Sequence, residues 1–364
     1  MHTGTMSSSW ASRRLRWAVP TVVAVMVAGA VAVSAAAAGA TTPDLPSRTA
    51  AELISDLAGS HTTALSGTVR ETSDLGLPAL PSSVTGTLGP LTLATGTNTL
   101  RVSADGPDKS RVALTGQLAE YDVVHSGKNV WTYSNQQNQA VHYVLPAKPA
   151  GAAEPKTPGE VPSTPAQAAA AALAAIDPST QVGVDESVMV AGRAARQLVL
   201  TPKDAGSLVG SVRVAVDAAT SVPLRVQVFA HANTATPAFE VGFTDVTFSK
   251  PAASVFTFTP PAGAQVSQTT VPAPAQGTPD KHAPAAQGPD SAPTTQGSGW
   301  TSIVVIPHVD LSALTKNQPK LLDELTTRVG KGRMLSTALV SALLTDDGRL
   351  LVGAVPPDAL QAAA

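Results

Sequence analysis

Residues 212–228 consist of two runs in which apolar and polar residues alternate, separated by the segment from Asp217 to Pro223. The apolar residues of both runs share one parity, and a period of two is typical of a strand with one apolar and one polar face. They are Val212, Val214, Val216, Leu224, Val226 and Val228. The pattern predicts a hairpin in an antiparallel sheet.

Similar short runs recur along the chain. They lie at 65–70, 84–88, 99–104, 111–115, 121–125, 130–133, 141–144, 181–190, 195–201, 211–217, 222–230 and 238–248. Turn-forming residues join many of them, as at 105–109, 126–129 and 134–139. In the last run the apolar parity shifts, which predicts a bulge at Thr244 and Asp245. We therefore expect an α+β fold that is mainly antiparallel β.

Two helices are predicted between these runs. Thr49 and Glu52 form a capping-box pattern, and Gly59 is placed to end the helix that follows. Thr164 and Pro165 begin a second helix, rich in alanine, that reaches Ile176. The first carries a stripe of leucine and isoleucine, whereas the second offers few large side chains.

The C-terminal part predicts a strand at 300–306, a helix at 319–329, a hairpin around Asp347 and Gly348, and one helical turn at 356–364. We expect residues 300–364 to complete the same sheet as an extension. Two proline-rich segments are poor in large apolar residues and cannot bury a core. We expect 146–163 to be a mobile insertion within a domain spanning 47–266, and 267–299 to be disordered.

Residues 1–40 have the pattern of an export signal. Three arginines, at positions 13, 14 and 16, precede an apolar run that ends in small residues. The stretch 17–40 is also long enough to span a membrane as a retained anchor. Either alternative places the folded part outside the cytoplasm, in the cell envelope.

Composition narrows the function classes. The chain has no cysteine, so it forms no disulfide and lacks the residue to which the lipid of a bacterial lipoprotein is attached. Without residues 1–40 it would have 21 basic and 26 acidic residues and a net charge of −5, which disfavours nucleic-acid binding. Its histidines are scattered, and no nucleophile elbow or facing carboxylate pair is evident. We expect a non-enzymatic protein, monomeric, without cofactor or metal.

The apolar stripes are the positive signal for a site. On each expected element the large apolar side chains lie on one face, beneath only two helices. Such a stripe is an ordinary core or, because two helices hardly cover ten strands, the wall of an apolar cavity. The candidate lining residues are Leu53, Leu57, Leu100, Val102, Val112, Leu114, Tyr121, Val123, Leu198, Leu200, Val214, Leu224 and Val226.

Several segments resemble the LolA/RseB-type exported proteins in their actinobacterial form. The first is "TAAELISDLAGSHTTALSGTVRETSDLGLP", where a helix leads into a strand. The next are "TLRVSADGPDKSRVAL" and "EYDVVHSGKNVWTYSNQQNQAVHY". Two late segments, "VAVDAATSVPLRVQVF" and "VGFTDVTFSKPAASVFTFTPPAGA", complete a resemblance that covers residues 47–266.

The resemblance implies a curved, half-open β-barrel with helices as a lid. It also implies binding of the acyl chains of lipids or lipoproteins or, as the alternative, an envelope-stress regulator whose partner is a membrane anti-sigma factor or a transporter. An acyl chain needs no polar motif for recognition, because each buried methylene contributes about 0.8 kcal/mol.

Overall fold

The computed structural model describes residues 43–59, 64–77, 96–116, 120–146, 163–270, 293–307, 309, 321–330 and 332–364. The expected export signal at 1–40 and the expected strand at 84–88 lie outside these residues. So does most of the expected insertion at 146–163. Within them, no helix is long and apolar enough to cross a membrane.

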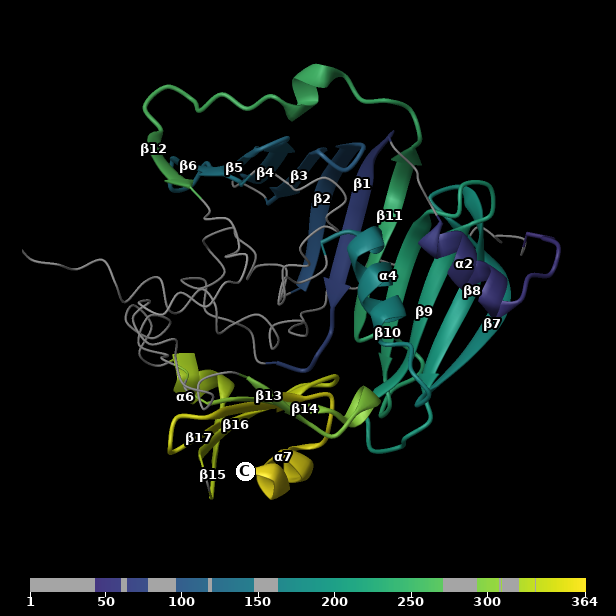
Figure 1. The fold of residues 1–364 in the computed structure, drawn as a ribbon, viewed down its shortest axis with the longest axis vertical. Helices are drawn as coiled ribbons and strands as arrows, with labels where there is room; N and C mark the ends of the chain where they lie inside the picture. Colours follow the sequence, from purple (N-terminus) through teal and green to yellow (C-terminus); the bar gives the residue numbers. More distant parts are fainter. Residues whose placement is uncertain are drawn as a thin grey trace, which may run out of the picture.

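Most of the described chain forms one large sheet of twelve strands (Figure 1). The order across it is β12-β6-β5-β4-β3-β2-β1-β11-β10-β9-β8-β7. Its strands are β1 (Ala64–Ser73), β2 (Gly96–Asp105), β3 (Lys109–Thr115), β4 (Glu120–Ser126), β5 (Asn129–Ser134), β6 (Gln139–Val144), β7 (Thr180–Val190), β8 (Arg193–Pro202), β9 (Val209–Asp217), β10 (Pro223–Ala230), β11 (Phe239–Thr247) and β12 (Gln265–Thr270).

The predicted strands and turns correspond closely to this sheet. The hairpin at 212–228 is β9 paired with β10, and Val214 lies opposite Val226. The turns that follow β2 and β4 place Gly106 and Gly127 at positive φ, which glycine adopts without strain. The predicted bulge is confirmed, because the register between β1 and β11 skips Thr244.

Two antiparallel meanders are joined by one long-range pair. Strands β1–β6 follow one another in the sheet, as do β7–β11, and β1 pairs with β11 in the middle. Only β12 is parallel to its neighbour, β6. The sheet is open, since its edge strands β12 and β7 each have one neighbour, so the expected half-open barrel is not confirmed.

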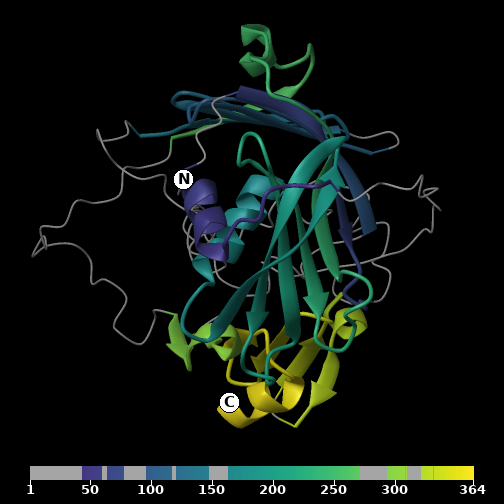
Figure 2. The same cartoon turned by 90° about the vertical axis from the view of Figure 1, so that its right-hand side faces the viewer.

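Two helices lie on one side of the sheet, which we call the inner face. Helix α2 (Ala50–Ala58) has the predicted capping box between Thr49 and Glu52 and packs on β7. Helix α4 (Pro165–Ala174) is capped by Thr164 and packs on β10 and β11. Figure 2 shows both helices on the concave side of the β7–β11 half. Neither helix packs on β3–β6 to a comparable extent.

The C-terminal residues form a second, smaller sheet rather than completing the first, which corrects our expectation. Its order is β13-β14-β18-β17-β16-β15. In the described part of the chain these strands hydrogen-bond to one another and not to a strand of the large sheet. They are β13 (Thr294–Gln296), β14 (Ile303–Ile306), β15 (Thr327–Val329), β16 (Gly332–Ser336), β17 (Ser341–Thr345) and β18 (Leu350–Gly353), with α6 (Leu321–Leu325) and α7 (Pro357–Ala363).

Two further expectations differ from the structure. The helix expected at 319–329 ends at Leu325, because Thr327 and Val329 pair with β16 and so belong to a strand. The segment 267–299, expected to be disordered, has strand structure at both ends, in β12 and in β13. Backbone pairing with β6 and β14 provides these ends with order that their side chains do not predict.

The small sheet is joined to the large one through the turn between β16 and β17. Leu339, at the tip of this turn, is 1% exposed and belongs to the main apolar cluster of the large sheet. The neighbouring N–H of Ala338 donates to the carbonyl of Leu75, at 2.8 Å. A second contact comes from Trp300, whose indole N–H donates to the hydroxyl of Thr180 at 2.8 Å. These two contacts connect the small sheet to the apolar core of the large one.

Adjacent residues of β2 provide a test of the inner face. Leu100 is 1% exposed, whereas Thr99 is exposed on the opposite face. We expect Leu100→Asp to lower the free energy of unfolding by several kcal/mol, because it buries a carboxyl group without a partner. Thr99→Asp, the matched control, should cost less than about 1 kcal/mol. Urea denaturation measures both, and equal losses would contradict the assignment of faces.

Candidate functional site

The candidate lining residues come together on the inner face. Ten of the thirteen are buried in one apolar cluster: Leu53, Leu57, Leu100, Val102, Leu114, Leu198, Leu200, Val214, Leu224 and Val226. Val112 and Tyr121 are partly buried and pack against this cluster. Val123 lies on the same face but outside the cluster, and it is also partly exposed. The β7–β11 half is thus a filled core beneath the two helices.

Burial decreases along the inner face from the middle of the sheet toward β6. One cross-strand row begins at Val102, which is 5% exposed, and continues through Val112 and Val123 to Val141. The last three are all partly exposed. A parallel row ends at Val130 and Tyr143, also partly exposed.

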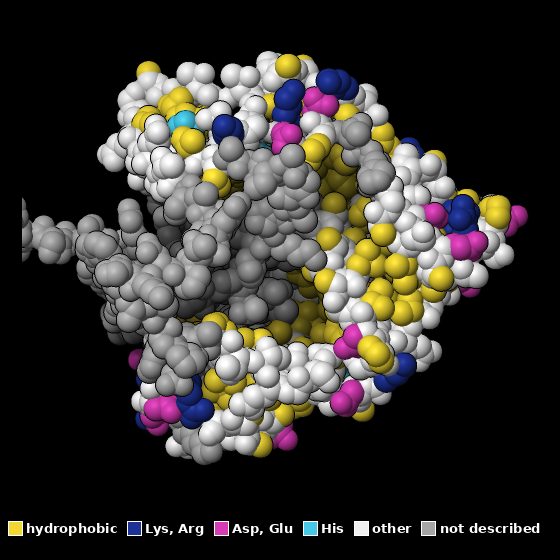
Figure 3. All heavy atoms as spheres, viewed as in Figure 1, with side chains coloured by type: hydrophobic (Ala, Val, Ile, Leu, Met, Phe, Trp, Pro, Cys, Tyr) yellow, Lys and Arg dark blue, Asp and Glu magenta, His cyan; other side chains and the backbone are white. Residues whose placement is uncertain are grey.

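We call the partly exposed residues of this half the apolar patch. Its members are Val112, Tyr121, Val123, Val130, Val141 and Tyr143. Three of them were absent from the candidate set drawn from the sequence, although 130–133 and 141–144 were predicted as strands. Cross-strand register identifies them, and a single sequence does not provide register. Figure 3 shows hydrophobic side chains gathered right of centre, over the half of the large sheet that carries α2 and α4.

The small sheet contributes a second apolar surface. Helix α7 packs on β17 and β18 and covers the cluster that contains Leu343, Leu351 and Leu360. A separate cluster lies on other positions of the same strands and contains Val340, Ala342 and Val352, with Leu335 and Leu350 partly buried beside it. Figures 1 and 2 place α7 on the side of the small sheet turned away from the large one.

The opposite, outer face of β3–β6 is occupied by the chain itself. After β11, residues 248–264 cross this face and then lead into β12. Phe256 is 4% exposed in the short helix η2 (Ala253–Phe256), which packs on β3 and β4. The ring of Phe258 lies 5.4 Å from that of Trp131 and 5.6 Å from that of Tyr133. The apolar patch is therefore on the face that this crossing segment leaves free.

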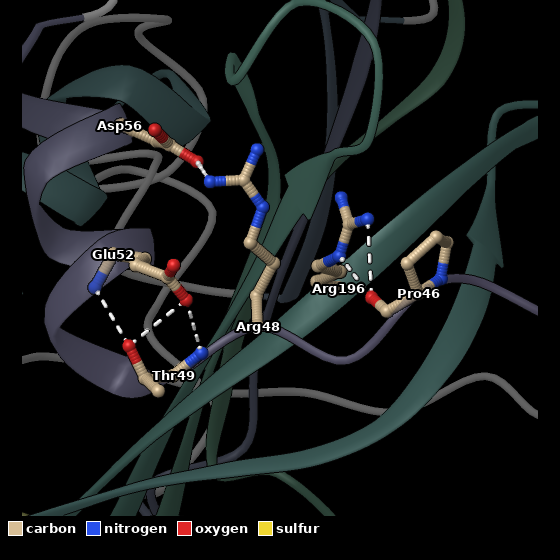
Figure 4. A network of polar contacts seen from close by, with 6 residues as sticks. All are labelled: Pro46, Arg48, Thr49, Glu52, Asp56 and Arg196. Atoms are coloured by element: carbon tan, nitrogen blue, oxygen red, sulfur yellow. Dashed lines mark hydrogen bonds and ion pairs between the residues drawn. The ribbon is translucent and has the colours of Figure 1, made fainter.

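Polar contacts hold the segment before α2 (Figure 4). The guanidinium of Arg196, on β8, donates twice to the carbonyl of Pro46, each at 3.3 Å. Arg48 forms an ion pair with Asp56 within the helical segment, at 3.4 Å. These groups are largely exposed, so each contact contributes little to stability, and together they set where the helix enters the inner face.

One buried carboxyl group lies on this apolar face. Glu71, on β1, is 0% exposed and accepts hydrogen bonds from the hydroxyl of Ser73 at 2.6 Å and from the side-chain amide of Asn98 at 2.7 Å. Burial raises the pKa of Glu71 from 4.5 to about 7, and the two hydrogen bonds offset this only in part. Sequence analysis missed this residue, because the alternation alone does not show which polar position faces inward.

The described residues contain no group of three or more histidines or carboxylates that could hold a metal ion. They do offer an apolar surface and, in Glu71, one buried carboxyl group with a raised pKa.

Comparison with known proteins gives distant structural likenesses. No protein-family model matches the chain, and no curated protein matches it. The complex of MucA and MucB from Pseudomonas aeruginosa aligns with 86% of this chain and 96% of its own, at 16% identity and a TM-score of 0.41. A conserved protein of Thermus thermophilus aligns with 60% of this chain and 99% of its own, at 15% identity and a TM-score of 0.35.

A LolA superfamily protein of Nitrosomonas europaea is also similar in structure. It aligns with 58% of this chain and 99% of its own, at 9% identity and a TM-score of 0.24. All three likenesses are at low identity, and none of them specifies an actinobacterial type.

Glu71 makes stability depend on pH. Because its pKa is raised to about 7 in the folded protein, it binds a proton more tightly there than in the unfolded chain. The associated stability is complete below pH 4.5 and is lost as the pH rises to about 7, a loss of roughly 3 kcal/mol. Glu71→Gln should remove this dependence, as measured by urea denaturation between pH 4.5 and 8. Glu120→Gln, at an exposed position of β4, should retain it.

Proposed function

We propose that this chain is a non-enzymatic protein of the cell envelope that binds the acyl chain of a lipid or lipoprotein on the apolar patch. The main observation in support is that the inner face of β3–β6 presents a row of partly exposed valines and tyrosines. The same face of β7–β11 is covered by two helices. A flexible apolar ligand gains affinity from such a surface without polar recognition.

Burial of a long acyl chain is sufficient for binding of this kind. At about 0.8 kcal/mol per methylene, a chain of sixteen carbons contributes on the order of 10 kcal/mol before the costs of association. The tyrosines at the border of the patch suit the polar end of such a ligand, because their rings are apolar and their hydroxyls can remain in water. Export, by the signal or anchor at 1–40, is part of this proposal.

Two positions on β6 provide a matched test. Val141 is on the patch and Val144 is on the outer parity of the same strand, and both are partly buried. We expect Val141→Asp to reduce uptake of a fluorescent fatty acid by at least tenfold, because it places a charge against the acyl chain. Val144→Asp should leave uptake unchanged. The protein recovered from the producing cells is used, and its unfolding midpoint is measured for each variant.

If the unmodified chain, Val141→Asp and Val144→Asp bind the fatty acid with equal affinity, the patch is not the binding site. Native mass spectrometry of the unmodified protein, with and without extraction in organic solvent, provides an independent measure. Absence of any bound lipid, together with no uptake of the fluorescent fatty acid, would contradict the proposed function.

A second function, favoured by a different observation, is binding of a membrane protein partner such as an anti-sigma factor or a transporter. All the large apolar side chains that are strongly exposed among the described residues lie on the two edge strands: Val184 and Met189 on β7, and Val266 on β12. An edge strand has unpaired backbone groups and accepts an additional strand from a partner.

Cross-linking in intact membranes tests this second function. We expect Val184→Glu combined with Met189→Glu to abolish cross-links to an anchored protein while leaving fatty-acid uptake unchanged. Thr99→Glu, on an exposed position away from the edge, is the control and should retain the cross-links. Failure of the wild-type chain to cross-link to any anchored protein would contradict this function.

A further inference from the structure

The buried carboxyl of Glu71 lies next to the junction between the two sheets. Ser73, which donates to it, is followed two residues later by Leu75, whose carbonyl accepts the N–H of Ala338. Leu339 then inserts into the apolar cluster of the large sheet, and both Leu75 and Leu339 are 1% exposed. The turn at 337–340 thus closes one end of the inner face, where β1 ends.

This turn is held by few interactions. Its internal hydrogen bonds join Thr337 to Val340 and to Leu339, and one backbone hydrogen bond joins it to Leu75, just after β1. The remaining attachment at this point is the packing of Leu339 and Ala338 against the apolar cluster. A segment held by so few contacts can open locally without global unfolding.

Around Glu71 the described elements provide neutral neighbours. Asn98 and Leu100 come from β2 and Val241 from β11, which lies opposite Glu71 in register. Helix α4 and the turn 337–340 contain no ionisable residue. The charged residues next to Glu71 in the pairing, Arg70, Arg101 and Glu240, occupy positions of the opposite parity and so belong to the outer face.

An ionised carboxylate in these surroundings has no cation to pair with among the described residues and must recruit water. Because β1 is hydrogen-bonded along both edges, to β2 and to β11, we place the entry of water at its end, where the turn 337–340 contacts Leu75. Opening the turn would expose Leu75 and Leu339 together with the end of the apolar cluster.

We propose that Glu71 is a proton-operated latch between the two sheets: the neutral side chain keeps the turn 337–340 docked on β1, and the ionised side chain releases it. The released turn opens the apolar inner face, so the latch regulates access to the acyl-chain site. This regulation of access rests on the proposed function. The conformational step itself is independent of any ligand.

The size of the effect follows from the difference between the two states of the carboxyl group. Opening should become more favourable as the pH rises from 4.5 toward 7 and should level off above 7, because both states are then ionised. Between pH 5.5 and 7.5 the opening constant rises about 20-fold if hydration restores the ordinary pKa of Glu71.

The absence of cysteine makes the test direct, because a single introduced thiol is then unique. Ala338→Cys places it on the turn, and Ala359→Cys places it on α7, where the residue is also partly buried. The rate of labelling by a maleimide is measured from pH 5.5 to 7.5 in the full chain. Dividing the rate at 338 by the rate at 359 removes the change in thiolate fraction.

We expect this ratio to rise about 20-fold over that range in the parent chain and to stay constant when Glu71→Gln is added. Adding Ser73→Ala instead should move the rise to higher pH, because the hydrogen bond from Ser73 lowers the pKa of Glu71. A constant ratio in the parent chain, or an equal rise with Glu71→Gln, would overturn the latch.

The outcome is separable from that of the proposed function. Labelling requires no lipid, so the latch can hold in a protein that fails to take up the fluorescent fatty acid. Conversely, fatty-acid uptake that depends on Val141 but shows the same affinity at pH 5.5 and 7.5 would retain the acyl-chain site and remove its regulation by Glu71.

Discussion

The pairing of β1 with β11 is the interaction on which the rest of the structure depends. It joins two meanders that would otherwise be separate sheets, and it places Val69 opposite Phe243 at the centre of the apolar cluster. The bulge at Thr244 lies in this pair, and there Gly67 permits a backbone approach that a side chain would obstruct. Neither the helices nor the small sheet would have a common surface to pack on without it.

The joined sheet has more apolar surface than the described helices and loops cover, and the uncovered part is the candidate site. Two helices and the tip of one turn seal the inner face of β7–β11, and the segment 248–264 covers the outer face of β3–β6. Among the described helices, none packs comparably on the inner face of β3–β6. This exposed apolar surface is the basis of the proposed acyl-chain site.

Local patterns in the sequence predict most elements because the forces that form them are local. The capping box at Thr49, the bulge at Thr244 and the hairpin at 212–228 are each determined by residues a few positions apart. The same patterns do not contain information on which distant strands pair. For this reason the separate small sheet, the parallel strand β12 and the inward position of Glu71 were not predicted. Each depends on a partner far along the chain.

The candidate site shows the same division. Ten of its thirteen predicted residues are buried together, because alternation identifies an apolar face reliably. The distinction between a filled core and an accessible wall depends on what covers that face. In the β7–β11 half the two helices cover the face, so it is a filled core. The alanine-rich composition of α4 allows this helix to approach the sheet closely. Val141 and Tyr143, at the accessible end, were missed for want of register.

The distance along the chain between β1 and β11 has a consequence for folding. Ser66 pairs with Thr247, so about half of the chain must be made after the first strand before that strand gains its second neighbour. Pairing at such separation closes a long loop and is slow compared with formation of the hairpins. Until then β1 is a ten-residue edge with an apolar face, the kind of segment on which chains associate wrongly. A newly made chain therefore has a period in which one edge of β1 is unpaired and open to association with other chains.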